Sequence, residues 1–112
     1  MIVKVSYEAI NDIAEIKRYI REECCNPAAA NRIANKITNK YKLLKTSPYI
    51  GAALNAVADI ESDYRYLVCG SYIIFYRILS DHVEVVRIIY GRRDYAKIIF
   101  GNDNNFQEDT ED

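Results

Sequence analysis

The strongest constraint on the fold comes from three apolar runs, residues 64–69, 72–79 and 83–90, in this 112-residue sequence. All three are rich in β-branched and aromatic residues and too short to compete as helices, so they predict strands. The connections hold two and three residues, whereas a parallel return needs about a dozen or more. The sequence therefore predicts a three-stranded antiparallel meander.

A short strand and two helices are predicted ahead of the meander. Residues 2–7 alternate well enough for a strand beside the meander. Apolar residues then recur every three or four positions, which indicates an amphipathic helix that ends near Glu23 or Cys24. Asn26 and Pro27 begin a second helix, because asparagine caps helices well and proline fits the first helical position. This helix is expected to run to about Thr46.

The two helices are expected to form a tight antiparallel hairpin, since the three alanines at 28–30 allow a close approach. The predicted fold class is α+β, an antiparallel αα-hairpin packed on a small antiparallel β-sheet in the order β-α-α-β-β-β. A short C-terminal helical turn over residues 95–100, capped by Asp94, should fold back on the body. The long loop over residues 47–63 contains small apolar residues, among them Leu54, that are expected to pack on the helix hairpin.

Charge divides the chain into two parts. Residues 101–112 hold five acidic residues and no basic one, whereas residues 1–100 carry 15 basic and 11 acidic residues, a balance of +4. Residues 1–100 are therefore predicted to be one domain, and residues 101–112 an acidic disordered tail. The alternative is that the tail folds back over a basic sheet face as a weak mimic of a partner.

Several protein classes are excluded by what the sequence lacks. No stretch approaches the roughly 18 consecutive apolar residues of a membrane span, and the first residues lack a signal-peptide core. We therefore expect a soluble, cytoplasmic protein without a membrane partner. Cys24 and Cys25 are adjacent and Cys69 lies at a turn, so reduced thiols are expected. The single histidine, His82, makes no zinc site with cysteines at this spacing, and neither metal nor cofactor is expected.

The predicted order of elements coincides with short motifs spread over residues 1–100. They are AINDIAEIKRYI at 9–20, NPAAA at 26–30, SPYIG at 47–51, YRYLV at 64–68, GSY at 70–72, FYRI at 75–78 and VRIIYGRRDY at 86–95. In order and spacing, these motifs make the chain similar to the RelE/ParE superfamily of bacterial type II toxins. The resemblance implies a small toxin of the plasmid stabilisation type, encoded with a cognate antitoxin that binds and neutralises it.

The resemblance implies one of two activities. One branch is a ribosome-dependent mRNA endoribonuclease, and its best-known form carries five functional positions. Matched one by one, those positions fall on Arg65, Leu67, Ile73, Arg93 and Ile99, so two cationic residues remain. Arginine stabilises negative charge but is a poor proton acceptor, because it is always protonated. No catalytic residue is assigned, and a nuclease would have to rely on Arg65, Arg93 and Tyr95.

The other branch, called ParE-like, inhibits DNA gyrase and needs no nuclease residues. This chain shares with it the Tyr-Gly-Arg-Arg-Asp sequence at 90–94 and the long helix hairpin. A net charge of −1 is also weak for a protein that must hold a ribosome through phosphate contacts. Gyrase inhibition without enzymatic activity is the favoured hypothesis, and mRNA cleavage on the ribosome is the alternative. The oligomeric state stays open between a homodimer and a toxin–antitoxin hetero-oligomer.

Basic and aromatic residues of the strands are the candidates for binding the target or the antitoxin. They are Arg65, Arg77, Arg87, Tyr90, Arg92, Arg93 and Tyr95. Arg65, Arg87 and Arg93 are expected to be exposed, on a cationic sheet face opposite the helices, because arginine is almost never buried without a partner. The alternative is intramolecular pairing of the arginines with Asp59, Glu61, Asp63, Glu84 or Asp94.

Overall fold

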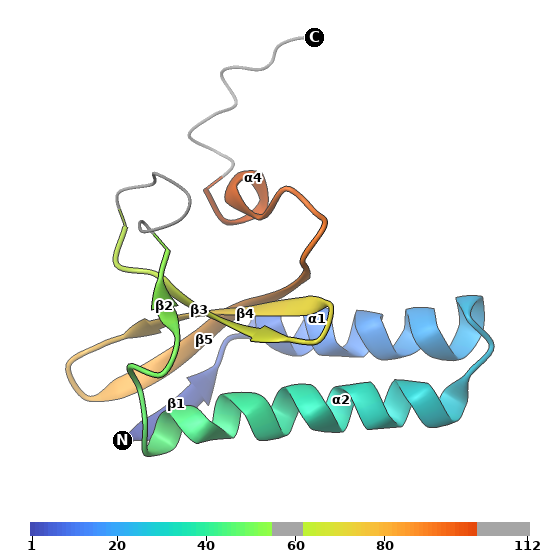
Figure 1. Ribbon diagram of the computed structural model, residues 1–112, viewed down its shortest axis with the longest axis horizontal. Helices are drawn as coiled ribbons and strands as arrows, with labels where there is room; N and C mark the ends of the chain where they lie inside the picture. Colours follow the sequence, from blue (N-terminus) through green and yellow to red (C-terminus); the bar gives the residue numbers. More distant parts are fainter. Residues whose placement is uncertain (55–61, 101–112) are drawn as a thin grey trace, which may run out of the picture.

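The computed structural model describes residues 1–54 and 62–100, and for Tyr95 and Ala96 the backbone alone. Its elements in chain order are β1 (Ile2–Val5), α1 (Tyr7–Arg18), α2 (Pro27–Lys42), β2 (Ala52–Ala53), β3 (Arg65–Cys69), β4 (Tyr72–Ile78), β5 (His82–Tyr90) and α4 (Tyr95–Phe100). A π-helical turn, Tyr19–Glu23, extends α1, and a 3₁₀ turn, Leu43–Lys45, extends α2. The helices α1 and α2 lie side by side beneath the sheet, and α4 lies above it (Figure 1). No helix in these ranges is both long and apolar enough to cross a lipid bilayer.

The sheet has the strand order β1-β5-β4-β3-β2. The antiparallel meander of β3, β4 and β5 is confirmed, with Tyr72 opposite both Cys69 and Tyr90. The expected place of the first strand beside the meander is confirmed, because β1 pairs with β5. The predicted antiparallel sheet is wrong at this strand, since the pair is parallel, with Val3 opposite Val83. The helix hairpin supplies the long crossover that a parallel pair requires. The short strand β2, inside the predicted loop, was not predicted.

Side chains at both helix starts explain where the helices begin. Ser6 precedes α1 and accepts a hydrogen bond from the Ala9 amide at 3.0 Å. Asn26 accepts one from the Ala29 amide at 3.1 Å, and Pro27 follows at the first helical position, as predicted. Each cap satisfies an amide that has no partner within its own helix. The two helices therefore begin where local sequence chemistry places them.

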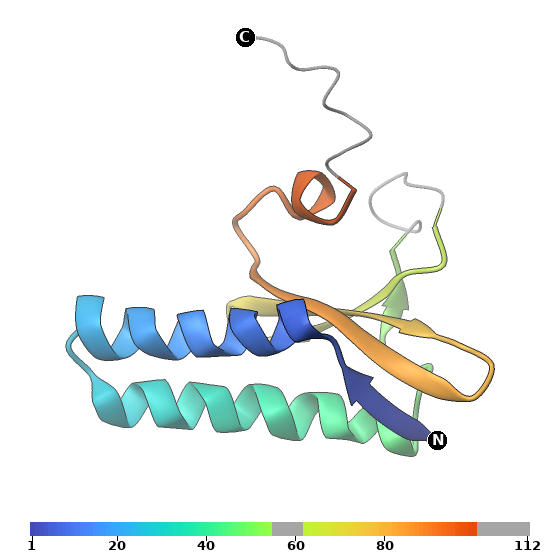
Figure 2. The same cartoon turned by 180° about the vertical axis from the view of Figure 1, so that it is seen from behind.

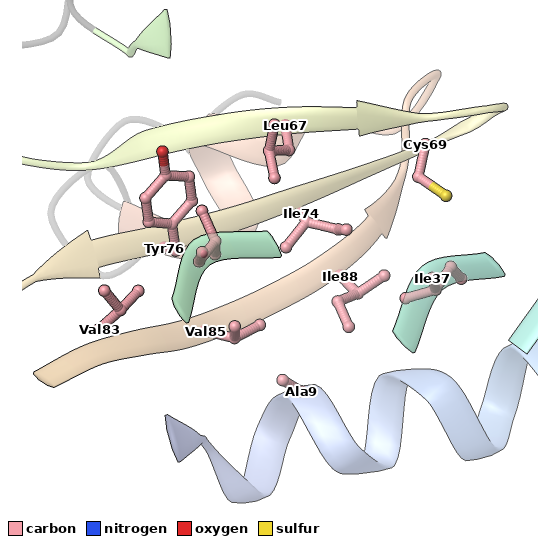
Figure 3. Packing of buried hydrophobic residues seen from close by; sticks show 10 residues of the cluster. Ala9, Ile37, Leu67, Cys69, Ile74, Tyr76, Val83, Val85 and Ile88 are labelled. Carbon is pink, nitrogen blue, oxygen red and sulfur yellow. The ribbon is translucent and has the colours of Figure 1, made fainter. Parts of the chain in front are cut away.

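The main core lies between the helix hairpin and one face of the sheet. Figure 3 shows Ala9 of α1 and Ile37 of α2 facing Ile74, Val85 and Ile88 of the strands. All five are at most 2% exposed. A second cluster joins the two helices directly, where the predicted small-residue contact is confirmed by Ala29 and Ala30 packed against Ile20.

The opposite face of the sheet is apolar rather than cationic, so the prediction of a basic face is wrong. Leu54, Phe75 and Ile89 form a buried cluster there, and Ile98, Ile99 and Phe100 of α4 pack against it. Figure 2 shows α4 on the side of the sheet away from α1 and α2. Neighbouring strand residues point to opposite faces, so apolar runs without alternation need a cover on each side.

Two further predictions about loops have different outcomes. The fold-back of residues 98–100 onto the body is confirmed by the edge-to-face contact of Phe100 with Tyr64, whose ring centroids are 5.2 Å apart. The prediction that Leu54 packs on the helix hairpin is wrong, because its contacts are on the far face of the sheet. The other small apolar residues of that loop, 56–58, lie outside the described residues.

Tyr76 holds the loop after α2 against the sheet. Its buried hydroxyl donates to the Pro48 carbonyl at 2.8 Å and accepts from the Gly51 amide at 3.0 Å. Gly51 is itself buried, and a Cβ there would overlap the Tyr66 carbonyl oxygen and the Tyr76 ring. A glycine is therefore required at this position, because the loop passes close to the β3 backbone and the Tyr76 ring.

We expect Gly51→Ala to lower the free energy of unfolding by about 2 kcal/mol, because the added methyl group overpacks a rigid contact. Gly70→Ala is the matched control: Gly70 has a φ of +61° but open space around it, so only backbone strain of about 1 kcal/mol applies. Urea unfolding of both variants measures the difference. A smaller loss for Gly51→Ala than for Gly70→Ala would contradict the proposed contact.

Candidate functional site

The end of β5 places Arg92 and Arg93, two of the predicted site residues, at one edge of the molecule. After Tyr90, the Gly91 amide donates to the Ser71 carbonyl at 2.8 Å and the Arg93 amide to the Tyr90 carbonyl at 3.0 Å. These bonds turn the chain sharply beside the β3–β4 hairpin. Asp94 then caps α4 through the Lys97 amide at 3.2 Å, as predicted.

Arg92 and Arg93 are exposed and make no ion pair with any residue that the structure describes. The predicted pairing of Asp94 with an arginine does not occur among those residues either. Both guanidinium groups are thus available to a partner. For Tyr95, whose backbone starts α4, the side chain lies outside the described residues, so its predicted role stays a prediction.

A hollow of about 410 Å³ opens between α1 and the end of the sheet. We call it the tyrosine hollow, because Tyr19, Tyr72 and Tyr90 line it, together with Glu15, Ile16, Arg18 and Arg93. The rings of Tyr72 and Tyr90 are 5.8 Å apart and tilted by 60°. Tyr19 is 53% exposed and Tyr90 40%, so their aromatic faces are open to a partner.

Tyr19 and Tyr72 are not among the site residues predicted from the sequence. The structure joins both to Tyr90, because Tyr72 faces Tyr90 across the β4–β5 ladder. Tyr19 begins the π-helical turn, in which the Cys24 amide donates to the Tyr19 carbonyl at 3.2 Å. Such turns are frequent at functional sites. Continued from the short β4–β5 loop, the register would place Tyr72 opposite Ile89. A shift between Phe75 and Tyr76 brings Tyr72 opposite Tyr90 instead, so the sequence carried no clear signal for this pairing.

Burial raises the pKa of Tyr72 above its usual range, with the nearby Tyr90 as a further cause. The shift makes ionisation of the phenol still less favourable than in a free tyrosine. Tyr72 is therefore suited to hydrogen bonding and apolar contact, and it is a poor proton acceptor.

Arg87 is partly buried and paired, so its predicted exposure is wrong. Its Nε and Nη2 donate to the two carboxylate oxygens of Asp12 in α1, each at 2.8 Å. Asp12 also accepts the backbone amide of Ile88 at 2.9 Å. β1 pairs with β5 only as far as Val85, so the edge of β5 beyond Val85 has no neighbouring strand. The Asp12 carboxylate accepts the Ile88 amide on this open edge. Asp12 thereby fastens α1 to β5.

Arg77 confirms the alternative of intramolecular pairing. Its guanidinium donates to both carboxylate oxygens of Asp63, with the shortest distance 2.9 Å from Nη2. It also lies 5.6 Å from the centre of the Tyr64 ring. The hydrogen bond from Arg77 holds the pKa of Asp63 below its usual range.

Arg65 is directed at the loop after α2, so the prediction that it is free for a partner is wrong. Its Nη2 donates to the Gly51 carbonyl at 2.6 Å and to the Tyr49 carbonyl at 3.3 Å. The guanidinium also lies 5.1 Å from the centre of the Tyr49 ring. Arg65 therefore fastens this loop to β3 beside Tyr76.

A comparison with protein families decides what kind of protein this is. The family model described as "ParE toxin of type II toxin-antitoxin system, parDE" matches residues 3–95. The chain belongs to the ParE toxin family. The resemblance to RelE/ParE toxins seen in the sequence is thereby confirmed. No curated protein sequence matches the chain.

Three solved structures have a similar fold. The chromosomal ParDE toxin–antitoxin system from P. aeruginosa matches with a TM-score of 0.66 and 19% identity, over 80% of this chain and 95% of that one. The YoeB/ParE toxin from Agrobacterium tumefaciens matches with a TM-score of 0.54 and 16% identity, over 80% of this chain and 98% of that one. YafQ from E. coli strain BL21(DE3) matches with a TM-score of 0.51 and 16% identity, over 79% of this chain and 90% of that one. At these identities the likeness is one of fold alone.

Arg65 and Arg93, two of the three residues named for a nuclease, lie at different places along the sheet. Arg65 lies opposite Tyr76 of β4. Tyr90, three residues before Arg93, lies opposite Tyr72, which is four residues from Tyr76 on the same strand. At about 3.3 Å per residue, the two sites are separated by roughly 13 Å along the strand. The described part of the chain also holds no cluster of three or more metal-ligating side chains.

Removing the Asp12 carboxylate should destabilise the fold strongly. We expect Asp12→Ala to lower the free energy of unfolding by about 2 to 4 kcal/mol, because Arg87 and the Ile88 amide both lose their partner. Asp12→Asn keeps one acceptor and should cost about half as much. Glu15→Ala, which breaks an exposed pair with Arg18 on the same helix, is the control and should have a much smaller effect. Equal losses for Asp12→Ala and Glu15→Ala in urea unfolding would contradict this role.

The Arg77–Asp63 pair should contribute a small, pH-dependent stability. The pKa of Asp63 is lower in the folded chain than in the unfolded one, so the contribution is present above about pH 4 and is lost as the pH falls further. Asp63 is 60% exposed, so Asp63→Asn should cost less than about 1 kcal/mol at pH 7. Urea unfolding of the unchanged chain and of Asp63→Asn from pH 7 to pH 2 measures this contribution. A difference in the free energy of unfolding between the two that grows toward low pH would contradict the prediction.

Proposed function

We propose that this chain inhibits DNA gyrase by direct protein–protein contact and is silenced by a cognate antitoxin protein. The observation that carries the proposal is the ParE family match over residues 3–95, because gyrase inhibition is the activity of that family. We place this activity in the cytoplasm, where gyrase and DNA are found. Residues 1–100 act as the toxin domain in this proposal.

The contact surface that we propose is the edge formed by the end of β5. Tyr90, Arg92 and Arg93 are exposed there, beside the tyrosine hollow. Tyrosine and arginine are the residue types that most often dominate the energy of protein interfaces, especially around an apolar pocket. The other arginines of the strands, Arg65, Arg77 and Arg87, contribute through the fold, since each is held by an intramolecular contact.

The nuclease alternative lacks a supporting observation. Cleavage of RNA needs a proton acceptor near groups that stabilise a developing phosphorane. Arg65 is engaged with two carbonyl groups, and burial raises the pKa of Tyr72, which lines the tyrosine hollow together with Arg93. We therefore propose inhibition without bond-breaking chemistry and assign no catalytic residue.

A supercoiling assay tests the proposal. Purified chain should prevent DNA gyrase from supercoiling relaxed plasmid, and Arg92→Ala with Arg93→Ala should raise the concentration needed for inhibition by about tenfold to a hundredfold. Lys42→Ala removes an exposed charge at the far end of α2 and should leave inhibition unchanged.

A cell-free translation assay supplies the opposing outcome. The proposal expects protein synthesis from a preformed mRNA to continue in the presence of the chain. Cleavage of that mRNA on the ribosome, together with unimpaired gyrase, would overturn gyrase as the target. The family membership of the chain would be unaffected by that result.

A further inference from the structure

A second hollow of about 250 Å³ lies next to the tyrosine hollow, and Tyr72 lines both. We call the second one the hairpin hollow. It lies between Gly70 at the tip of the β3–β4 hairpin and Arg32 and Lys36 on α2. Together the two hollows form a surface at the end of the sheet, with tyrosine rings at one side and basic side chains at the other.

The charges of this surface are mostly uncompensated. Arg32, Lys36 and Arg93 are all exposed, and none makes an ion pair with another described residue. Arg18, in the wall of the tyrosine hollow, differs because it is paired with Glu15 and Glu22. The surface therefore suits an occupant that combines an aromatic side chain with several carboxylates.

One segment of this chain has that composition. Residues 101–112 contain a single aromatic residue, Phe106, and no basic residue. Their carboxylates lie on both sides of Phe106 in sequence, at Asp103, Glu108, Asp109, Glu111 and Asp112. Opposite charges and an aromatic anchor make the segment complementary to the two hollows.

The segment is also long enough to reach the surface. It follows Phe100, whose ring contacts Tyr64 at the start of β3. The five residues of β3 cover about 17 Å toward the hairpin, and residues 101–106 span about 20 Å when extended. The segment starts on the α4 face of the sheet and both hollows lie on the helix face, so its path also rounds the end of the sheet. All twelve residues span about 40 Å, so carboxylates beyond Phe106 reach the hairpin hollow.

We propose that residues 101–112 dock on the same molecule, with Phe106 in the tyrosine hollow and the carboxylates facing Arg93, Lys36 and Arg32. Covalent linkage gives the segment an effective concentration near the millimolar range, so even weak affinity yields substantial occupancy. The docked segment covers Tyr90 and Arg93. If those residues bind the target as proposed above, a partner has to displace the segment first, and this consequence alone rests on the proposed function.

A single tryptophan tests the docking without reference to activity. The chain contains no tryptophan, so Phe106→Trp in the full chain gives an unambiguous reporter. Its emission should lie at shorter wavelength than that of the free peptide 101–112 with the same substitution, and acrylamide should quench it about threefold less efficiently. Salt at 1 M should abolish both differences, because exposed charges are screened beyond about 3 Å.

Charge reversal then tests the position. Lys36→Glu with Arg93→Glu should release the reporter, so that its quenching equals that of the free peptide. Lys42→Glu with Lys45→Glu makes the same change of charge on α2 and its 3₁₀ extension, outside both hollows, and should leave the reporter shielded. Circular dichroism of each variant verifies that the fold is retained.

Three results would overturn the docking. The first is quenching in the full chain equal to that of the free peptide. The second is a tryptophan reporter that stays shielded from acrylamide after charge reversal at Lys36 and Arg93, which would mean that the segment docks at another place. The third is equal release by both charge-reversal pairs, which would indicate unspecific attraction. None of these results bears on gyrase inhibition, which the supercoiling assay reads separately.

Discussion

The attachment of α1 to the open edge of β5 is the contact on which the rest of the structure depends. Asp12 provides it, because one carboxylate accepts from Arg87 and from the Ile88 amide, 75 and 76 residues away in sequence. Parallel pairing with β1 covers β5 as far as Val85, and α1 takes over from there. This fixes the far end of α1, and hence Tyr19, in relation to the end of the sheet. Without it, the tyrosine hollow would lack one wall.

Two apolar layers, rather than one, determine which surface is left for partners. The helix hairpin covers one face of the sheet, and α4 with Leu54 covers the other. The broad faces of the sheet are therefore used for stability. The surface with open aromatic and basic side chains is the end of the sheet, where β5 ends and the β3–β4 hairpin turns.

The arginines illustrate how the same residue type serves the fold in one place and a partner in another. Arg65, Arg77 and Arg87 are held by carbonyl or carboxylate groups, while Arg92 and Arg93 lie in an exposed turn. The backbone of an arginine inside a strand is fixed by the hydrogen bonds of the sheet, so its side chain pairs with the groups that pack next to that position. An arginine just past a strand is free of that constraint, which suits contact with a partner protein.

The sequence by itself determined the elements and their local starts and ends. The apolar runs of the meander, the cap at Asn26 and Pro27 and the alanine contact all depend on neighbours a few residues away, so they could be read directly. Tertiary structure alone decided the parallel place of β1, the far-face packing of Leu54 and the partners of Arg65 and Arg87. It also brought Tyr19 to Tyr72 and Tyr90. These features depend on strand register and on groups distant in sequence, and local patterns carry no information about which distant group arrives.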